Sequence, residues 1–363
     1  MKQRNLLLVV LLLLAGSIGF SQVLGRIEYM EGTVQISRNG TTLSGVDIGT
    51  SIENLDQVKT TPDSSVTIAF SKNSGLSGTL QIVPGTTAVI RQDQISGTAT
   101  NEVELLAGSV SLKVKRLAGV RSAAQVKTPT SVLGVRGTEF VVASFNGAVL
   151  IACKEGEVAC FAYSASTGSK STQSIPSVPG KLVEVMENGS MKSGDFPEGN
   201  FEENWDAVRD TWKNFYIELL VADPAAMLNA FAGNWSLYST KLESGAAKLR
   251  ANQTLKNWLK QGSTPSGSFG IWMKEKQAVV KDLISVRGDM MLAIITWYRI
   301  EELLPYIPES AMSRKLANGQ TIGSFIAQYK KSSKTVSNAI SLFRSAEKLY
   351  MLRNDGVSPF SDF

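Results

Sequence analysis

The chain changes its hydrophobic period about half-way along. Its first half consists of short apolar runs punctuated by glycine, such as SVTIAF and GSVSLKV. Val66, Ile68 and Phe70 alternate with polar residues, which is the period of two that a strand with one buried face shows. We therefore expect residues 22–190 to form an all-β domain, built as a sandwich or roll of short strands. Within it, the Ser/Thr/Gly/Pro-rich stretch 164–180 is typical of an exposed loop.

The second half is helical in pattern. Beyond an expected linker at residues 191–200, apolar residues recur about every 3.6 positions, which is typical of an amphipathic helix. Asn200 and the pair Asp223-Pro224 are expected to cap and begin the first two helices. The expected helices start near Phe201, Pro224, Ile271 and Ile322. They should form a bundle of about four helices over residues 201–354, followed by a C-terminal tail at 355–363, so the predicted fold class is α+β with separate domains.

The first 21 residues have the pattern of a signal peptide. Lys2 and Arg4 precede an apolar run, and Gly19 and Ser21 are the small residues that a signal peptidase recognises. An uncleaved anchor is the alternative, because the run is just long enough for a bilayer that needs about 20 apolar residues. No cysteine lies near the cut, which argues against a lipoprotein. We expect an exported protein of the periplasm or cell envelope that meets the membrane only through this segment, if it stays uncleaved.

The composition argues against several classes of function. With 37 Lys and Arg against 32 Asp and Glu, the net charge of +5 is too mild to indicate nucleic-acid binding. The chain has no histidine, which removes the commonest general base and the commonest metal ligand. Serine and lysine occur together at 169–171 and 331–334, but neither segment has the context of a strained nucleophile turn. We therefore predict no catalytic residue, no metal site and no cofactor.

Two cysteines flank a turn in the segment ACKEGEVAC. A hairpin centred on Glu155 and Gly156 would place Cys153 and Cys160 on one face, diagonally across two strands, and a bulge would bring them opposite each other. In an oxidising compartment such a pair tends to form a disulfide. The alternative is a pair of small buried apolar side chains, because diagonal positions are often further apart than the roughly 5.5 Å that a disulfide prefers.

All six tryptophans lie in the second half. Aromatic side chains dominate protein cores, so we expect most of them inside the bundle. Trp235 and Trp258 fit the apolar stripes least well. They are the candidates for stacking against a sugar ligand.

The segment TPTSVLGVRGTEF places two charges and two glycines in what is otherwise a buried-strand pattern. Pro129 lacks an amide hydrogen and suits the entrance of a strand. Gly134 and Gly137 permit close backbone approach or a bulge. Arg136 and Glu139 would face opposite ways in an unbroken strand, so we expect a bulge at Gly137. The guanidinium can then tie nearby carbonyls to Glu139 or another acid and fasten a corner of the fold, although a ligand-binding arginine is the alternative.

The longer segment VKTPTSVLGVRGTEFVV resembles the signature of the FecR domain, an extracytoplasmic all-β module with a Thr-Pro, a short apolar run, Val-Arg-Gly-Thr and Glu-Phe. The flanking segments GTVQI, VPGTTAVI and GEVACFAY agree with this resemblance, which covers about residues 24–187. It marks six motif residues: Pro129, Gly134, Arg136, Gly137, Thr138 and Glu139.

The resemblance also suggests a class of function. The best-known FecR proteins are membrane-spanning regulators that carry signals from an outer-membrane iron transporter to a cytoplasmic sigma factor. Only residues 1–5 precede the apolar run here, so the chain looks more like a free-standing exported member of the family. We expect a non-catalytic binding or adaptor module that recognises an envelope protein or glycan. A component of envelope signal transduction is the alternative.

Overall fold

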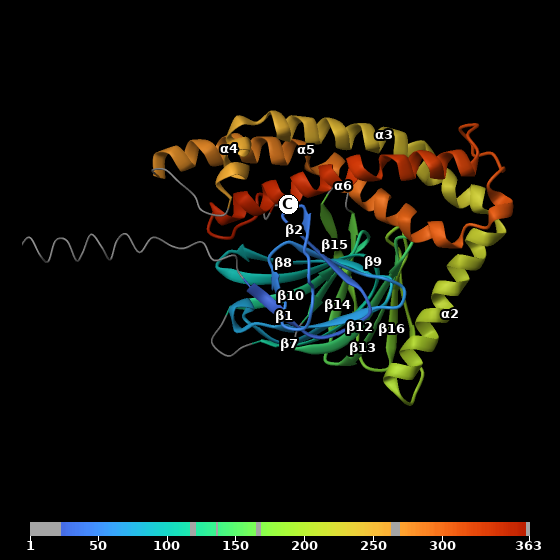
Figure 1. The fold of residues 1–363 in the computed structure, drawn as a ribbon. Helices are drawn as coiled ribbons and strands as arrows, with labels where there is room; N and C mark the ends of the chain where they lie inside the picture. The colour runs from blue at the N-terminus through green and yellow to red at the C-terminus, as the bar shows by residue number, and fades with distance from the viewer. Residues whose placement is uncertain (1–22, 117–120, 136, 165–167, 263–268, 361–363) are drawn as a thin grey trace, which may run out of the picture.

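The computed structural model describes residues 23–116, 121–135, 137–164, 168–262 and 269–360. The expected signal segment and Arg136 lie outside this part of the chain. Strands occupy residues 23–195 and helices residues 201–352 (Figure 1), which confirms the predicted α+β fold class.

The first half is a sandwich of two sheets. Sheet A has the order β4 (Ser51–Glu53), β1 (Val23–Glu31), β6 (Ser65–Phe70), β7 (Leu76–Ile82), β9 (Thr98–Arg116), β12 (Thr138–Phe145), β13 (Ala148–Glu155), β16 (Lys181–Val185), β17 (Met191–Asp195). Sheet B has the order β3 (Thr41–Thr42), β2 (Val34–Arg38), β5 (Asp56–Thr60), β8 (Thr87–Ile95), β9, β10 (Ser122–Lys127), β11 (Ser131–Val135), β14 (Val158–Ser164), β15 (Ser169–Ser177). Neighbouring strands are antiparallel except for the parallel pair β9–β10. The inner faces of both sheets form one apolar core.

The long strand β9 belongs to both sheets. Residues 98–107 pair with β8, and residues 108–116 pair with β7 and β12. The chain bends between these halves at Gly108, whose φ is +89°. A Cβ atom there would lie 2.6 Å from the Cα of Thr86, so only glycine fits. The bend lets one strand join the two sheets at their centre.

Two edge strands occupy segments that the sequence pattern assigned to irregular structure. β15 lies within the expected loop 164–180 and pairs with β14. β17 occupies the first half of the expected linker 191–200 and pairs with β16. Both strands are mostly exposed on their two faces, and Ile175, Pro176 and Met191 are their only residues that are neither polar nor glycine. The alternation that would have predicted them is therefore missing.

The helices are α2 (Phe201–Ala222), α3 (Pro224–Ala251), α4 (Gln253–Gln261), α5 (Phe269–Leu303) and α6 (Ile322–Leu352), and short 3-10 turns occur at η1 (Lys72–Ser74), η2 (Leu304–Tyr306) and η3 (Glu309–Ala311). Asn200 and Asp223 cap α2 and α3, as predicted. The expected second helix is interrupted at Asn252, whose side chain caps α4 by accepting a hydrogen bond from Leu255 N.

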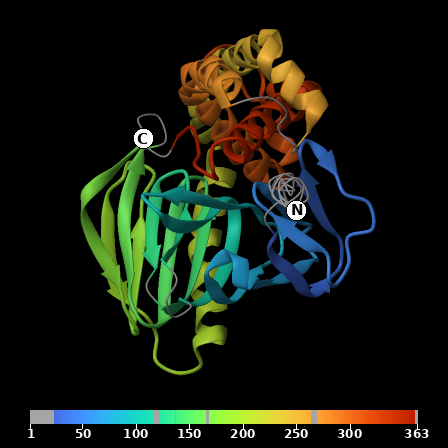
Figure 2. The same ribbon diagram turned by 90° about the vertical axis from the view of Figure 1, so that its left-hand side faces the viewer.

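The helices form a layer on one end of the sandwich, with the exception of α2. Helices α3, α5 and α6 lie side by side across the sandwich, whereas α2 runs down its flank (Figures 1 and 2). Trp205 of α2 packs against Val141 and Ala152 of sheet A. The prediction that α2 joins the bundle holds only for its second part: Trp205 lies against the outer face of sheet A, whereas Leu220 belongs to the core of the helical layer.

Within the described residues, no single helix has the length and apolarity needed to cross a membrane. Helices α2 and α3 meet that test only as a pair, and they are bent by 86° where they join.

Trp235 and Trp258 are core residues, so the prediction that they stack on a ligand was wrong. Their exposed fractions are 1% and 0%. Trp235 contacts the rings of Trp297 and Tyr329, and Trp258 Nε1 donates to Glu275 at 2.9 Å. Both tryptophans lie off the main stripes because α3 and α4 each contact more than one neighbouring helix, including both α5 and α6. A single-stripe pattern cannot indicate a helix that is buried on two sides.

Candidate binding sites between the sandwich and the helices

The Thr-Pro turn of the motif connects β10 to β11. Thr128 Oγ1 accepts hydrogen bonds from Ser131 N at 2.9 Å and from Thr130 N at 3.3 Å, which closes the turn around Pro129. Thr130 Oγ1 donates to the carbonyl oxygen of Gly147 at 2.7 Å. The turn is thereby attached to the hairpin tip between β12 and β13.

The second half of the motif carries the chain from one sheet to the other. β11 lies in sheet B and β12 in sheet A, so the crossing falls between Val135 and Thr138, where Gly137 has a φ of +60°. The expected bulge within one unbroken strand was therefore wrong at this point. An irregularity in register follows at Glu139 in the β12–β13 pair.

Glu139 lies in ion pairs on the outer face of sheet A. Its carboxylate contacts Lys113 at 2.7 Å and Lys154 at 3.0 Å. The hydrogen bond from Lys113, followed by that from Lys154, lowers its pKa. Gly134 lies inside β11 opposite Ala159, and Thr138 is buried at the start of β12. The predicted clasp by Arg136 falls on a residue that the structure does not describe.

Cys153 and Cys160 are free thiols. The predicted hairpin at Glu155 and Gly156 was wrong, because β13 pairs with β12 and β16 whereas β14 pairs with β11 and β15. The turn carries the chain between the sheets, and both cysteines face the shared core. Burial raises the pKa of Cys153 to about 11 and that of Cys160 to about 12.

Both cysteines should be unreactive in the folded protein. The thiolate is the reactive form, and at neutral pH both side chains stay protonated. We expect a thiol-specific reagent to modify neither cysteine before unfolding and both cysteines after unfolding without reductant. A reduced sample gives the reference value for two thiols. A denatured, unreduced sample with no reactive thiol would contradict the free state.

Two side chains of helix α5 bind the backbone of Asn146 at the tip of the β12–β13 hairpin. Arg299 Nη2 donates to the carbonyl oxygen of Asn146 at 2.8 Å and lies 2.6 Å from Glu187. Glu302 Oε2 accepts a hydrogen bond from Asn146 N at 2.7 Å. Burial raises the pKa of Glu302 to about 7, although the Asn146 amide and the nearby cation of Lys213 oppose this shift. The same tip thus joins the motif turn to the helical layer.

A groove of about 690 Å³ opens beside this tip. Pro129, Thr130 and Tyr163 line its sandwich wall, and Phe231 and Tyr238 line its helical wall. The remaining lining includes serine, threonine and asparagine side chains, several aliphatic residues, and the charged residues Lys170, Glu187 and Arg299. The groove therefore combines aromatic faces with hydrogen-bonding groups, which is a composition suited to binding.

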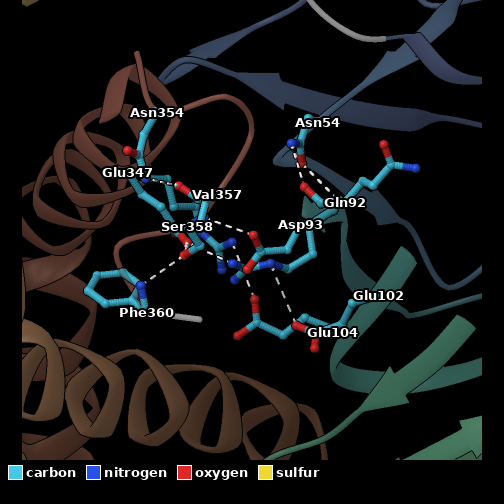
Figure 3. A network of polar contacts seen from close by, with 12 residues as sticks. Asn54, Gln92, Asp93, Glu102, Glu104, Glu347, Asn354, Val357, Ser358 and Phe360 are labelled. Atoms are coloured by element: carbon cyan, nitrogen blue, oxygen red, sulfur yellow. Dashed lines mark hydrogen bonds and ion pairs between the residues drawn. The ribbon is translucent and has the colours of Figure 1, made fainter. Parts of the chain in front are cut away.

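A second polar site lies between sheet B and the end of α6 (Figure 3). Arg91 Nη2 contacts Glu347 at 2.7 Å, and its Nε lies 3.7 Å from Glu102. Asp93 accepts a hydrogen bond from Ser358 N at 2.8 Å. These side chains border a cavity of about 130 Å³. Burial opposes the charge of Arg91, but the acids around it outweigh this effect and raise its pKa.

Further ion pairs join the two layers around this cavity. Arg344 lies 3.5 Å from Glu104, whose pKa is lowered because the attraction of Arg344 and other cations outweighs its burial. Elsewhere at the interface the linked pairs are Lys59–Glu301, Lys348–Glu53 and Tyr298–Gln57. These contacts fix the helical layer on the sandwich. In the described residues, no group of three or more Cys, Asp or Glu is arranged to hold a metal ion.

Sequence reasoning missed this charged interface. The partners are far apart in the chain, as in the pair Arg91–Glu347, and periodicity says nothing about such pairs. One signal was present: Arg91 directly follows the apolar run 88–90, and Glu102 and Glu104 lie on either side of Val103. Charged residues are rarely buried unless they are paired.

The family model described as FecR protein matches residues 56–159. The chain contains a FecR domain. The match begins with β5 and ends at the second residue of β14, so it includes the motif turn, Cys153 and the whole of β9 but not Cys160. The search of curated proteins finds no match.

Two crystal structures of a protein from Parabacteroides distasonis ATCC 8503, assigned as an anti-sigma factor, are similar to part of this chain. They were solved at 1.65 Å and 2.50 Å, are 14% identical in sequence, and match with TM-scores of 0.30 and 0.24. Each match covers 38% of this chain and 59% of the other. The chain therefore spans less than two thirds of the length of that protein. At these TM-scores the likeness adds no argument to the FecR domain match.

Proposed function

We propose that this FecR-domain protein is a non-catalytic, extracytoplasmic binding or adaptor module. Its partner is an envelope protein or glycan, which binds in the groove beside the motif turn. The observation that carries this proposal is that Pro129 and Thr130 of the motif line the groove together with Phe231 and Tyr238 of α3. Neither the sandwich nor the helical layer forms this groove alone.

The available chemistry supports binding rather than turnover. The chain has no histidine to act as a general base. Burial raises the pKa values of Cys153 and Cys160 far above neutral, so these thiols are poor nucleophiles. The groove presents hydroxyl, amide and aromatic side chains, and two of its charged residues, Arg299 and Glu187, form an ion pair with each other. Such groups recognise a ligand without needing to activate it.

The test is a crosslinked pull-down from the native envelope with matched variants. Asn234→Arg places a bulky cation on the exposed helical wall of the groove, and Ser333→Arg places the same cation on an exposed site of α6. We expect Asn234→Arg to reduce capture of the partner at least about fivefold, since losing groove contacts costs roughly 1 kcal/mol or more. Ser333→Arg should not reduce it. Equal capture by both variants would refute the groove as the binding site.

Envelope signal transduction is the second candidate, and the FecR domain match is what supports it. A relation to the membrane-spanning FecR regulators requires an anchored N-terminus. Mass spectrometry of the protein isolated from its native envelope distinguishes the two. A mature N-terminus at Gln22 would count against an anchored sensor, whereas an intact first segment would favour it.

A further inference from the structure

The positive charge of the chain is concentrated in one segment. Seven of the 37 Lys and Arg residues, but only one of the 32 Asp and Glu residues, lie between Lys248 and Lys281. This segment therefore has a net charge of +6, whereas the remainder of the chain has a net charge of −1. The total of +5 conceals this asymmetry, which indicates a local basic surface.

The segment lies at one end of the helical layer. It comprises the last residues of α3, the short helix α4 and the first turns of α5. In Figure 1 this end is on the left, where the start of α5 extends past the sandwich, and in Figure 2 it faces the viewer. We call it the basic end and define it by five exposed cations: Arg250, Lys256, Lys260, Lys274 and Lys281.

These five cations are not used by the fold. Within the described residues none of them has an ion pair or a hydrogen bond from its side chain. The nearby acids are already engaged: Glu275 accepts from Trp258 Nε1, and Asp282 contacts Lys248 and Asn252. By contrast with these five cations, Arg91 in the charged interface is mostly buried and forms an ion pair with Glu347. The basic end therefore has an excess of charge that an external anion is free to neutralise.

Apolar side chains are exposed among these cations. Leu259 is 44% exposed and directly precedes Lys260, and Met273 is 41% exposed and directly precedes Lys274. On α5, Ile284 is 42% exposed on the same helix face as Lys281, since these positions are three residues apart. The mixture of lysines with protruding aliphatic side chains is typical of a surface that meets the headgroup and acyl boundary of a bilayer.

We propose that the basic end docks on a bilayer that contains anionic phospholipids. The lysines approach the negative headgroups, and Leu259, Met273 and Ile284 enter the apolar boundary beneath them. Clusters of four to eight Lys and Arg on or beside an amphipathic helix are a recognised feature of anionic-lipid binding. Docking of this end leaves the groove beside the motif turn to a separate partner, because the two sites share no residue.

A bilayer explains the basic end better than a nucleic acid does. A nucleic-acid site combines cations with aromatic side chains or polar groups that contact bases, and it has no use for exposed aliphatic residues. Lipid binding uses both the charge and the aliphatic side chains. Nucleic acid therefore serves as the competing ligand in the test.

The test measures co-sedimentation of the full chain with vesicles. The vesicles contain phosphatidylcholine alone or with about 30% phosphatidylglycerol, which gives a negative surface. Neutral vesicles measure any binding through the apolar N-terminal segment. We expect binding to be at least about tenfold tighter on the anionic vesicles and to weaken at about 0.5 M salt, where charges are screened.

Two charge-reversal variants separate the basic end from the overall charge. Lys256, Lys260, Lys274 and Lys281 are changed to Glu in the first, and the exposed residues Lys72, Lys115, Lys331 and Lys334 are changed to Glu in the matched control. We expect the first variant to lose at least about tenfold in affinity for anionic vesicles, and the control to lose much less. Circular dichroism checks that both variants are folded.

A third variant tests the apolar contribution. Leu259→Ser combined with Met273→Ser should weaken binding about threefold or more while leaving the charge unchanged, since less apolar area enters the bilayer. Equal losses in the two charge variants would refute the proposal. So would an absence of binding to anionic vesicles, or tighter binding to a random DNA duplex than to the vesicles at the same salt.

Discussion

Arg91→Met is expected to lower the free energy of unfolding by about 3–5 kcal/mol, the range typical of removing one partner of a buried ion pair. The Arg91 side chain is 15% exposed, and its partners Glu347 and Glu102 are 4% and 10% exposed. Without the guanidinium, these two carboxylates remain beside a small cavity and lose the cation that lies closest to them. Urea unfolding monitored by tryptophan fluorescence measures the change.

Two further variants make this prediction specific. Arg91→Met combined with Glu347→Met removes both members of the main pair, so it should destabilise the protein less than Arg91→Met alone. Lys181→Met breaks an exposed pair with Asp195 and should cost less than about 1 kcal/mol. If Arg91→Met costs no more than Lys181→Met, the charged interface does not hold the helical layer in place.

Glu302→Gln is expected to make the protein more stable than wild type at alkaline pH and equally stable at acidic pH. Burial raises the pKa of Glu302 from 4.5 to about 7, so the folded state retains its proton where the unfolded state has lost it. Stability from this group is complete below about pH 4.5 and is lost as the pH rises through about 7. Because the side chain is partly exposed, we expect a difference of about 1–2 kcal/mol at pH 8.

The measurement is a series of urea unfolding curves from pH 5 to pH 8 for both proteins, at about 0.15 M salt. A glutamine oxygen still accepts the hydrogen bond from Asn146 N, so the contact with the hairpin tip is kept. Glu309→Gln at the exposed turn η3 is the control for the same substitution at another site. A difference for Glu302→Gln that does not change with pH would mean that this carboxyl group is not stabilised in its protonated form.

The periodicity of apolar residues predicted the β half and the helical half, and the residue types Asn200 and Asp223-Pro224 predicted two helix caps. Periodicity succeeded for strands such as β6, in which Val66 and Ile68 lie on the buried face and their neighbours are more exposed. It did not predict β15 and β17, which are exposed on both faces and carry no alternation. It also did not show that the first part of α2 packs on sheet A, since an apolar stripe does not reveal whether a helix or a sheet covers it.

The motif was found from the sequence, but its geometry was not. A hairpin was expected at Glu155 and a bulge at Gly137, and at both places the chain instead passes between the two sheets. Sequence patterns describe neighbours within a strand, whereas sheet order depends on pairings across the whole domain. The groove and the charged interface were missed for the same reason, because each combines residues from both halves of the chain.

The residues that match the FecR family model, 56–159, do not form a complete folding unit that could be expressed by itself. Residues 56–159 include β6 and β13 but omit β1 and β16, which pair with them. They also include β5 and the start of β14 but omit β2 and β15. A fragment cut to those limits would bare four strand edges at once, each with unpaired amide and carbonyl groups that invite aggregation. The flanking strands therefore act as protective covers for the recognisable part of the domain.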